Sequence, residues 1–163
     1  MARTPGQLSL KARAIGLLAR REHSRAELAR KLAPHCEDPA ELETLLNDLE
    51  RADLLSQRRF AESLVHRRAP RHGTRRIIHE LRQHGLPEDT LSELAQTLGA
   101  SERQRAHEVW FKRFGTPPAD TIEYARQYRY MAGRGFSADC VRAILGGKGF
   151  DPSDDPPPFP APP

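Results

Sequence analysis

Arginine is the residue type in this chain with the clearest chemical potential, because it gathers in one stretch. Residues 56–86 hold eight arginines against two glutamates, a net charge of +6 with the histidines neutral. A guanidinium group presents a rigid fork of N–H donors that fits phosphate and carboxylate oxygens. The alternative to a binding site is a solvated, highly charged helix face with no ligand. An excess of one sign over such a stretch favours an anionic partner instead.

The candidate binding residues bracket a predicted break between two helices. Pro70 and Gly73 interrupt the apolar pattern, so one helix should end before Pro70 and another should begin after Gly73. Arginines at the start of the second helix gain nothing from its dipole, which points to an external anion. The predicted binding residues at this corner are Arg67, Arg68, Arg71, Arg75 and Arg76. A further candidate surface lies later in the chain, around Arg129, Tyr130 and Arg134.

Other segments that resemble catalytic or metal sites have simpler explanations. Gly146-Gly147-Lys148-Gly149 lacks the GxxxxGK[ST] spacing of a phosphate-binding loop and follows a predicted helix, so we interpret it as a helix end. No His or Cys cluster has the spacing of metal ligands. No pair of acidic residues lies in a recognisable general acid–base context. We therefore expect no enzyme activity, no cofactor and no metal.

The elements that must position these arginines repeat about every 49 to 50 residues. Apolar positions of one predicted helix recur in later copies: Leu42, Leu45 and Leu49, then Leu91, Leu94 and Leu98, then Val141 and Ile144. Such spacing indicates stacked helical repeats, which offer a long surface to a partner rather than a pocket to a substrate. We expect these positions to face a core.

The apolar periodicity predicts an all-α protein with nine principal helices, since no segment alternates as a strand would. The predicted division is three three-helix repeats over residues 8–55, 56–100 and 101–149, followed by a proline-rich, disordered tail over 150–163. Ser24 and Glu27 predict a capping box at the start of one helix. Ser101 is expected to begin the first helix of the third repeat.

Composition places the chain in a reducing compartment. No apolar run approaches the roughly 18 residues of a membrane span, and the N-terminus has no apolar segment of a secretory signal. Cys36 and Cys140 lie far apart and without CxxC spacing, which disfavours a disulfide framework. We expect a cytoplasmic monomer without a membrane partner.

Four segments, in the same order, resemble signature segments of the RecX family. They are residues 26–32 (AELARKL) after His23-Ser24, residues 58–61 (RRFA), residues 73–86 (GTRRIIHELRQHGL), and residues 134–137 (RGFS) followed by Val141. The resemblance covers residues 8–146. One departure is Ser56-Gln57, where relatives usually carry acidic residues.

The resemblance implies an all-helical protein of three tandem three-helix repeats forming an elongated, curved module. RecX proteins bind the filament of the RecA recombinase and inhibit it. The implied role is a non-catalytic regulator that limits RecA's ATP hydrolysis, strand exchange and co-protease activity in DNA repair and the SOS response. The implied partners are RecA protomers and, second, DNA within or near the filament. The residues alone leave an alternative open: a direct nucleic-acid-binding module, because residues 24–32 can pass for a helix-turn-helix element.

Overall fold

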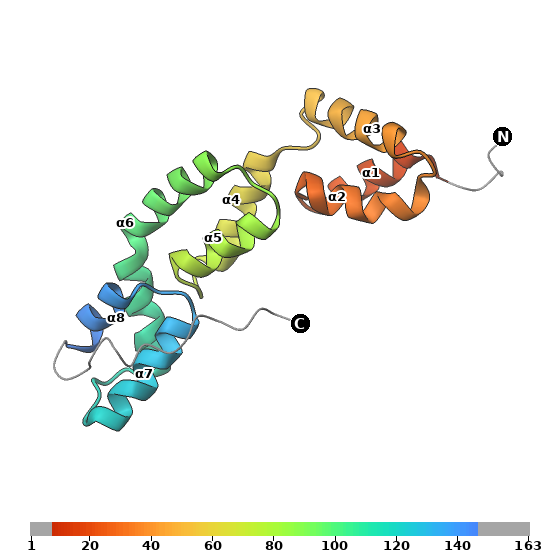
Figure 1. Ribbon diagram of the computed structural model, residues 1–163. Helices are drawn as coiled ribbons and strands as arrows, with labels where there is room; N and C mark the ends of the chain where they lie inside the picture. The colour runs from red at the N-terminus through yellow and green to blue at the C-terminus, as the bar shows by residue number, and fades with distance from the viewer. Residues whose placement is uncertain (1–7, 147–163) are drawn as a thin grey trace. The chain divides into compact units, whose positions relative to one another are not determined.

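The computed structural model describes residues 8–146, and the regular elements in that range are all helical (Figure 1). In chain order they are α1 (Leu10–Leu18), α2 (Arg25–Leu32), the 3-10 helix η1 (Ala33–His35), α3 (Pro39–Arg51), α4 (Gln57–Arg68), α5 (Thr74–Gln83), α6 (Glu88–Arg113), α7 (Thr121–Gly133) and α8 (Ala138–Leu145). The predicted all-α class is confirmed. The predicted tail, residues 150–163, lies outside the described range.

The described residues form two compact units, one of residues 8–64 and 81–86, the other of residues 65–80 and 87–146. In the first unit α1 and α3 pack against α2 around a leucine-rich core. Its buried residues are Leu10, Ala14, Leu28, Leu32, Leu42, Leu46, Leu49 and Leu55. In the second unit α6, α7 and α8 pack together around an aromatic core. Its buried residues include Trp110, Tyr124, Tyr128, Met131, Phe136 and Val141.

The start of α2 fulfils half of the predicted capping box. The Ser24 hydroxyl accepts a hydrogen bond from the Glu27 amide at 3.1 Å, as predicted. The Glu27 carboxylate does not return to the Ser24 amide. It pairs with the Arg21 guanidinium instead and lies 3.8 Å from His23 Nε2. A charged partner within reach wins because a charge-assisted bond is stronger than one to a neutral amide.

The prediction that Ser101 begins a helix is wrong, and with it the count of nine helices. Residues 8–146 hold eight α-helices, because α6 runs without a break through Gly99 and Ser101. A lone glycine inside a helix costs only about 1 kcal/mol, and no proline stands near it to end the helix. The Ser101 hydroxyl donates to the Leu98 carbonyl at 3.3 Å rather than capping a new N-terminus.

Equivalent positions of the sequence repeat have equivalent burial. The first position is buried in each of its copies, Leu42, Leu91 and Val141, and so is the third, Leu49 and Leu98. The second is half-buried in each, Leu45, Leu94 and Ile144. The expectation of a core position is therefore confirmed for the first and third places, and the second lies at the edge of the core.

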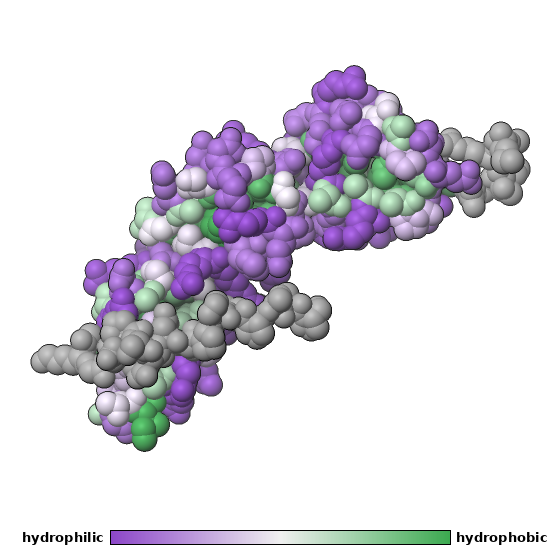
Figure 2. Space-filling view, in the orientation of Figure 1, coloured by the Kyte–Doolittle hydropathy of each residue, from purple (hydrophilic) through white to green (hydrophobic). Residues whose placement is uncertain are grey.

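Hydrophilic residues cover most of the face of both units seen in Figure 2, and apolar residues show only in small patches. Among the described residues, no helix combines the length and the apolar character needed to cross a membrane.

Candidate anion-binding site

The predicted break in the middle of the chain is a turn between α4 and α5. Helix α4 ends at Arg68 and α5 begins at Thr74. The Arg68 carbonyl closes the turn by accepting from the amides of Arg71 and His72, both at 3.0 Å. The candidate arginines thus lie where the sequence predicted them, in the last turn of α4, in the turn itself and in the first turn of α5.

This turn joins the turn between α7 and α8 through the main chain. The Gly73 amide donates to the Arg134 carbonyl at 2.9 Å, and the Arg75 amide donates to the Gly135 carbonyl at 3.2 Å. The backbones approach so closely that a Cβ on Gly73 would lie 2.2 Å from the Gly135 carbonyl carbon. Gly135 itself has a φ of +85°, which L-residues with a side chain rarely adopt. Only glycine fits both positions.

Two guanidinium groups cross the same joint in opposite directions. Arg76 donates to the Gly133 carbonyl at 3.3 Å, and Arg134 donates to the Arg71 carbonyl at 3.2 Å. The Arg134 guanidinium also lies over the Tyr130 ring, 4.6 Å from its centroid. The two candidate surfaces, which the sequence left as alternatives, therefore meet in the second unit. We call this surface the arginine corner: Arg67, Arg71, Arg75, Arg76 and Arg134, with Tyr130.

The candidate arginines differ in how far their charge is neutralised. Arg68 forms an ion pair with Glu80, whose two carboxylate oxygens accept from its guanidinium, and this pair raises the pKa of Arg68. Exposed Arg67, Arg71 and Arg75 have no ion-pair partner within residues 8–146. Their charges are not neutralised by a described acidic residue, whereas the charge of Arg68 is partly neutralised by Glu80. Arg129, predicted with the second surface, is exposed on α7 and likewise lacks an ion pair to any described residue.

The pKa of His72 is affected by the positive charges of the arginine corner. Burial of its ring lowers the pKa of His72, and the charges of Arg76, Arg134 and Arg68 lower it further. A backbone hydrogen bond at Arg68 opposes this shift without reversing it. The ring is therefore neutral near pH 7, and three guanidinium groups act on one half-buried side chain.

Glu102 and Arg105 of α6 form hydrogen bonds that fix the main chain of the arginine corner. The buried Glu102 carboxylate accepts from the Thr74 amide at 2.8 Å and from the Ser137 hydroxyl at 2.6 Å, at the starts of α5 and α8. Burial alone would raise the pKa of Glu102, but these hydrogen bonds outweigh it and lower the pKa below its ordinary value. Arg105 donates to the His72 carbonyl at 2.7 Å and so ties the turn to α6.

The sequence contains no local signal for these supporting residues. Glu102 and Arg105 look like ordinary charged positions on a helix, because their partners lie about thirty residues away. Together the arrangement presents exposed donors around a rigid turn, which suits an anion with several oxygens. Within residues 8–146, no group of three or more His, Cys, Asp or Glu side chains is placed to hold a metal ion.

Comparison with known proteins agrees with this architecture. Three family models match in order: the first three-helix domain of RecX over residues 11–49, the second over 56–94 and the third over 101–145. The chain is 56% identical over 151 residues to "Regulatory protein RecX" of Ralstonia nicotianae, covering 91% of this chain and 95% of that protein. It is 54% identical over 145 residues to the protein of the same name from Leptothrix cholodnii, covering 89% and 92%.

A solved structure has the same fold. The crystal structure of RecX from Lactobacillus salivarius superposes with a TM-score of 0.69 at 20% identity, over 83% of this chain and 92% of that one. The predicted fold of three three-helix repeats is confirmed by the three family models, and the last helix of the second repeat is continuous with the first helix of the third in α6. With matched domains over most of its length and relatives above half identity, the chain belongs to the RecX family of regulatory proteins.

Proposed function

We propose that this protein binds the RecA filament and inhibits its ATP hydrolysis, strand exchange and co-protease activity, without changing any substrate covalently. The proposal extends the regulatory role of the family to the partner that its members are expected to have. In the cell, the protein would act in the cytoplasm, in DNA repair and the SOS response.

The arginine corner is the observation that carries the proposal. Its exposed guanidinium groups Arg67, Arg71 and Arg75 lack ion-pair partners among the described residues. The turn that carries them is bonded through its main chain to the turn between α7 and α8. Such a preformed cationic surface would pair with acidic side chains of RecA protomers or with DNA phosphates in the filament. We take Arg129 as a neighbouring contact on α7.

The alternative, a helix-turn-helix element at residues 24–32, has less support. Arg25 of α2 binds Glu43, Asn47 and Glu50 through its guanidinium, at 2.7 to 2.8 Å. Lys31 lies 3.9 Å from Glu27. A recognition helix needs free donors for base edges and phosphates, and two of the three basic groups of α2 already have acidic partners, which leaves only Arg30.

The test is RecA's DNA-dependent ATP hydrolysis, measured with and without this protein. We expect hydrolysis to slow as the protein is added, at concentrations where the protein alone does not bind the same DNA. Unaltered hydrolysis and strand exchange at a large molar excess would refute the proposal. Equal binding to bare DNA, with steep salt dependence and no need for RecA, would favour the alternative.

A further inference from the structure

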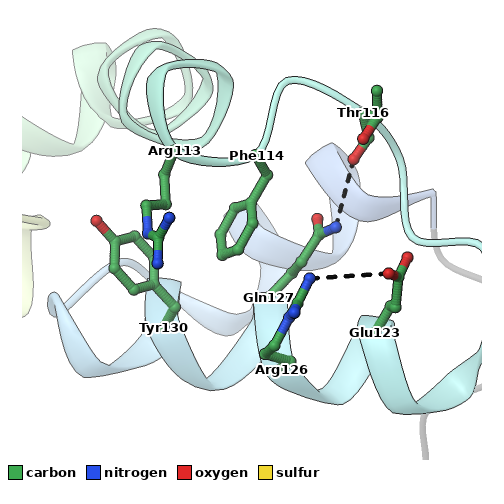
Figure 3. Close-up of a pocket in the computed structure, with 7 residues that line it drawn as sticks. All are labelled: Arg113, Phe114, Thr116, Glu123, Arg126, Gln127 and Tyr130. Atoms are coloured by element: carbon green, nitrogen blue, oxygen red, sulfur yellow. Dashed lines mark hydrogen bonds and ion pairs between the residues drawn. The ribbon is translucent and has the colours of Figure 1, made fainter.

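A pocket of about 280 Å³ lies beside the arginine corner, between the end of α6, the following loop and α7 (Figure 3). Its lining residues are Arg113, Phe114, Thr116, Glu123, Arg126, Gln127 and Tyr130. Gln127 forms a fixed wall: its amide oxygen accepts from the Trp110 indole at 2.7 Å, and its amide nitrogen donates to the Thr116 carbonyl at 3.3 Å. Gln127 is therefore held in place on one wall of the pocket, and the charged residues Arg113, Glu123 and Arg126 line the rest of it.

Guanidinium groups already cover the aromatic rings of the pocket. Arg113 lies over both Phe114 and Tyr130, with its central carbon 5.6 and 5.8 Å from the ring centroids. Arg126 lies 6.0 Å from the Phe114 centroid. In Figure 3 the Arg113 side chain reaches down across Tyr130. A nucleobase that binds by stacking needs an open ring face. These rings instead serve to hold the two cations in place.

The free donors of the pocket favour a carboxylate. Arg113 has no ion-pair partner among the described residues. Arg126 forms a long ion pair with Glu123, at 3.7 Å, which leaves the hydrogen-bond donors of its guanidinium unused by the described residues. Glu123 accepts from the Ala119 amide at 3.0 Å, so a peptide N–H is a ligand that this carboxylate already takes. A peptide supplies both N–H donors and carboxylates. A phosphodiester backbone supplies only acceptors and offers no N–H donor to Glu123.

We propose that this pocket binds a short acidic peptide segment of a protein partner, with one carboxylate held between Arg113 and Arg126 and a peptide N–H at Glu123. The planar fork of each guanidinium matches a carboxylate in two-point contact. The pocket shares only Tyr130 with the arginine corner. The proposal does not depend on the identity of the regulated protein.

Trp110 supplies a reporter inside the wall of the pocket. It is the single tryptophan of the chain, and its indole N–H bonds Gln127, so one resonance reports on this wall. The probe is a short capped peptide of alternating glutamate and serine, titrated into the full-length protein while the indole N–H is followed by NMR. The matched probes are the same peptide with glutamine for glutamate, and an oligothymidylate of equal charge.

We expect the glutamate peptide to shift the indole resonance saturably, and the glutamine peptide to leave it unchanged. Arg113→Gln and Arg126→Gln should each weaken binding by about tenfold, the worth of a charge-assisted contact. Arg103→Gln is the matched control: it removes an exposed charge from the same helix, outside the pocket, and should bind as the wild type does. The free indole resonance of each variant verifies folding.

Three outcomes would overturn the proposal. The glutamate peptide could leave the wild-type resonance unmoved at millimolar concentration. The oligothymidylate could bind as tightly, with the same shift, which would assign the pocket to nucleic acid. Arg103→Gln could weaken binding as much as the pocket variants, which would mean that only the general field attracts the peptide. The wild-type titrations decide the first two without any variant.

Discussion

At the scale of single residues, the candidate arginines divide by what their guanidinium groups already bind. Arg76 and Arg134 donate to main-chain carbonyls across the joint, and Arg68 donates to Glu80. Arg67 and Arg71 are exposed and lack ion pairs among the described residues. A variant that replaces every candidate arginine would lose structural hydrogen bonds as well as binding contacts. The arginines without ion pairs are therefore the ones to substitute.

We therefore expect Arg67→Gln/Arg71→Gln/Arg75→Gln to leave the melting temperature nearly unchanged and to weaken filament binding. Exposed charges contribute only about 0–1 kcal/mol to folding. Fewer charges at the interface should also make binding less sensitive to salt. The measurement is affinity for RecA filaments over a salt series.

Lys11→Gln/Arg20→Gln/Arg30→Gln is the matched control for this triple variant. It removes the same charge from exposed positions of the first unit that lack ion pairs to described residues. Equal affinities and equal salt slopes for the two triple variants would mean that the corner is only a solvated face.

Glu102 predicts a pH dependence of stability. Its pKa in the folded protein lies below its ordinary value, so its stabilising effect is present above that ordinary value and is lost as the pH falls through it toward the folded pKa. Glu102→Gln should cost about 1–3 kcal/mol at neutral pH because a charged acceptor is lost. The difference from the wild type should shrink as the pH falls below the ordinary pKa of a glutamate.

Chemical denaturation at several pH values measures this difference. Exposed Glu93 on the same helix gives the control, since Glu93→Gln should change stability little at any pH. A difference between wild type and Glu102→Gln that stays constant down to acid pH would contradict the assigned role.

At the scale of elements, the corner depends on the close approach of two turns. Gly73→Ala places a Cβ 2.2 Å from Gly135 main-chain atoms, which cannot yield as a flexible side chain would. We expect a loss of roughly 1–3 kcal/mol or more in unfolding free energy. Gly133→Ala, with nothing within 4 Å of its Cβ, is the control. An unchanged thermal midpoint for Gly73→Ala would show that the turns do not meet so closely.

Because α6 is continuous, we expect an alanine at Gly99 to raise stability, in contrast to an alanine at Gly73. Gly99 lies inside the helix, and a Cβ there meets nothing within 4 Å, so Gly99→Ala should stabilise by about 0.5–1 kcal/mol. Gly85→Ala should destabilise, because Gly85 has a φ of +78°. Thermal unfolding compares the two variants, and a loss of stability for Gly99→Ala would contradict a continuous helix at this position.

At the scale of the whole molecule, the repeat predicts which leucines matter equally. Leu49→Ala and Leu98→Ala occupy equivalent buried positions, and each should cost about 2–5 kcal/mol. Leu45→Ala and Leu94→Ala occupy the half-buried place and should each cost less. Urea denaturation of the four variants gives the ranking. If the half-buried pair cost as much as the buried pair, the repeat alignment would be off by a turn.

Local pattern was enough to predict most of the helices, the break at Pro70 and Gly73, and the arginines around it. It was not enough to join Gly73 to Gly135, because that contact links residues about sixty positions apart and depends on packing. Ser101 misled for a different reason: serine suits both a helix start and an exposed place inside a helix. Glu102 beside it carries the information that the sequence could not reveal, a carboxylate that bonds two distant helix starts.

The main-chain joint between Gly73 and Gly135 has a consequence for how such a surface can evolve. Hydrogen bonds between backbone groups position the corner, so substitutions at Arg67, Arg71 or Arg75 change the charge of the surface without moving its backbone. Heritable variation can then retune the charge of the corner, one residue at a time, while the glycines stay constant. A lineage whose partner changed in charge could adapt by substituting these surface residues, with the same backbone fold.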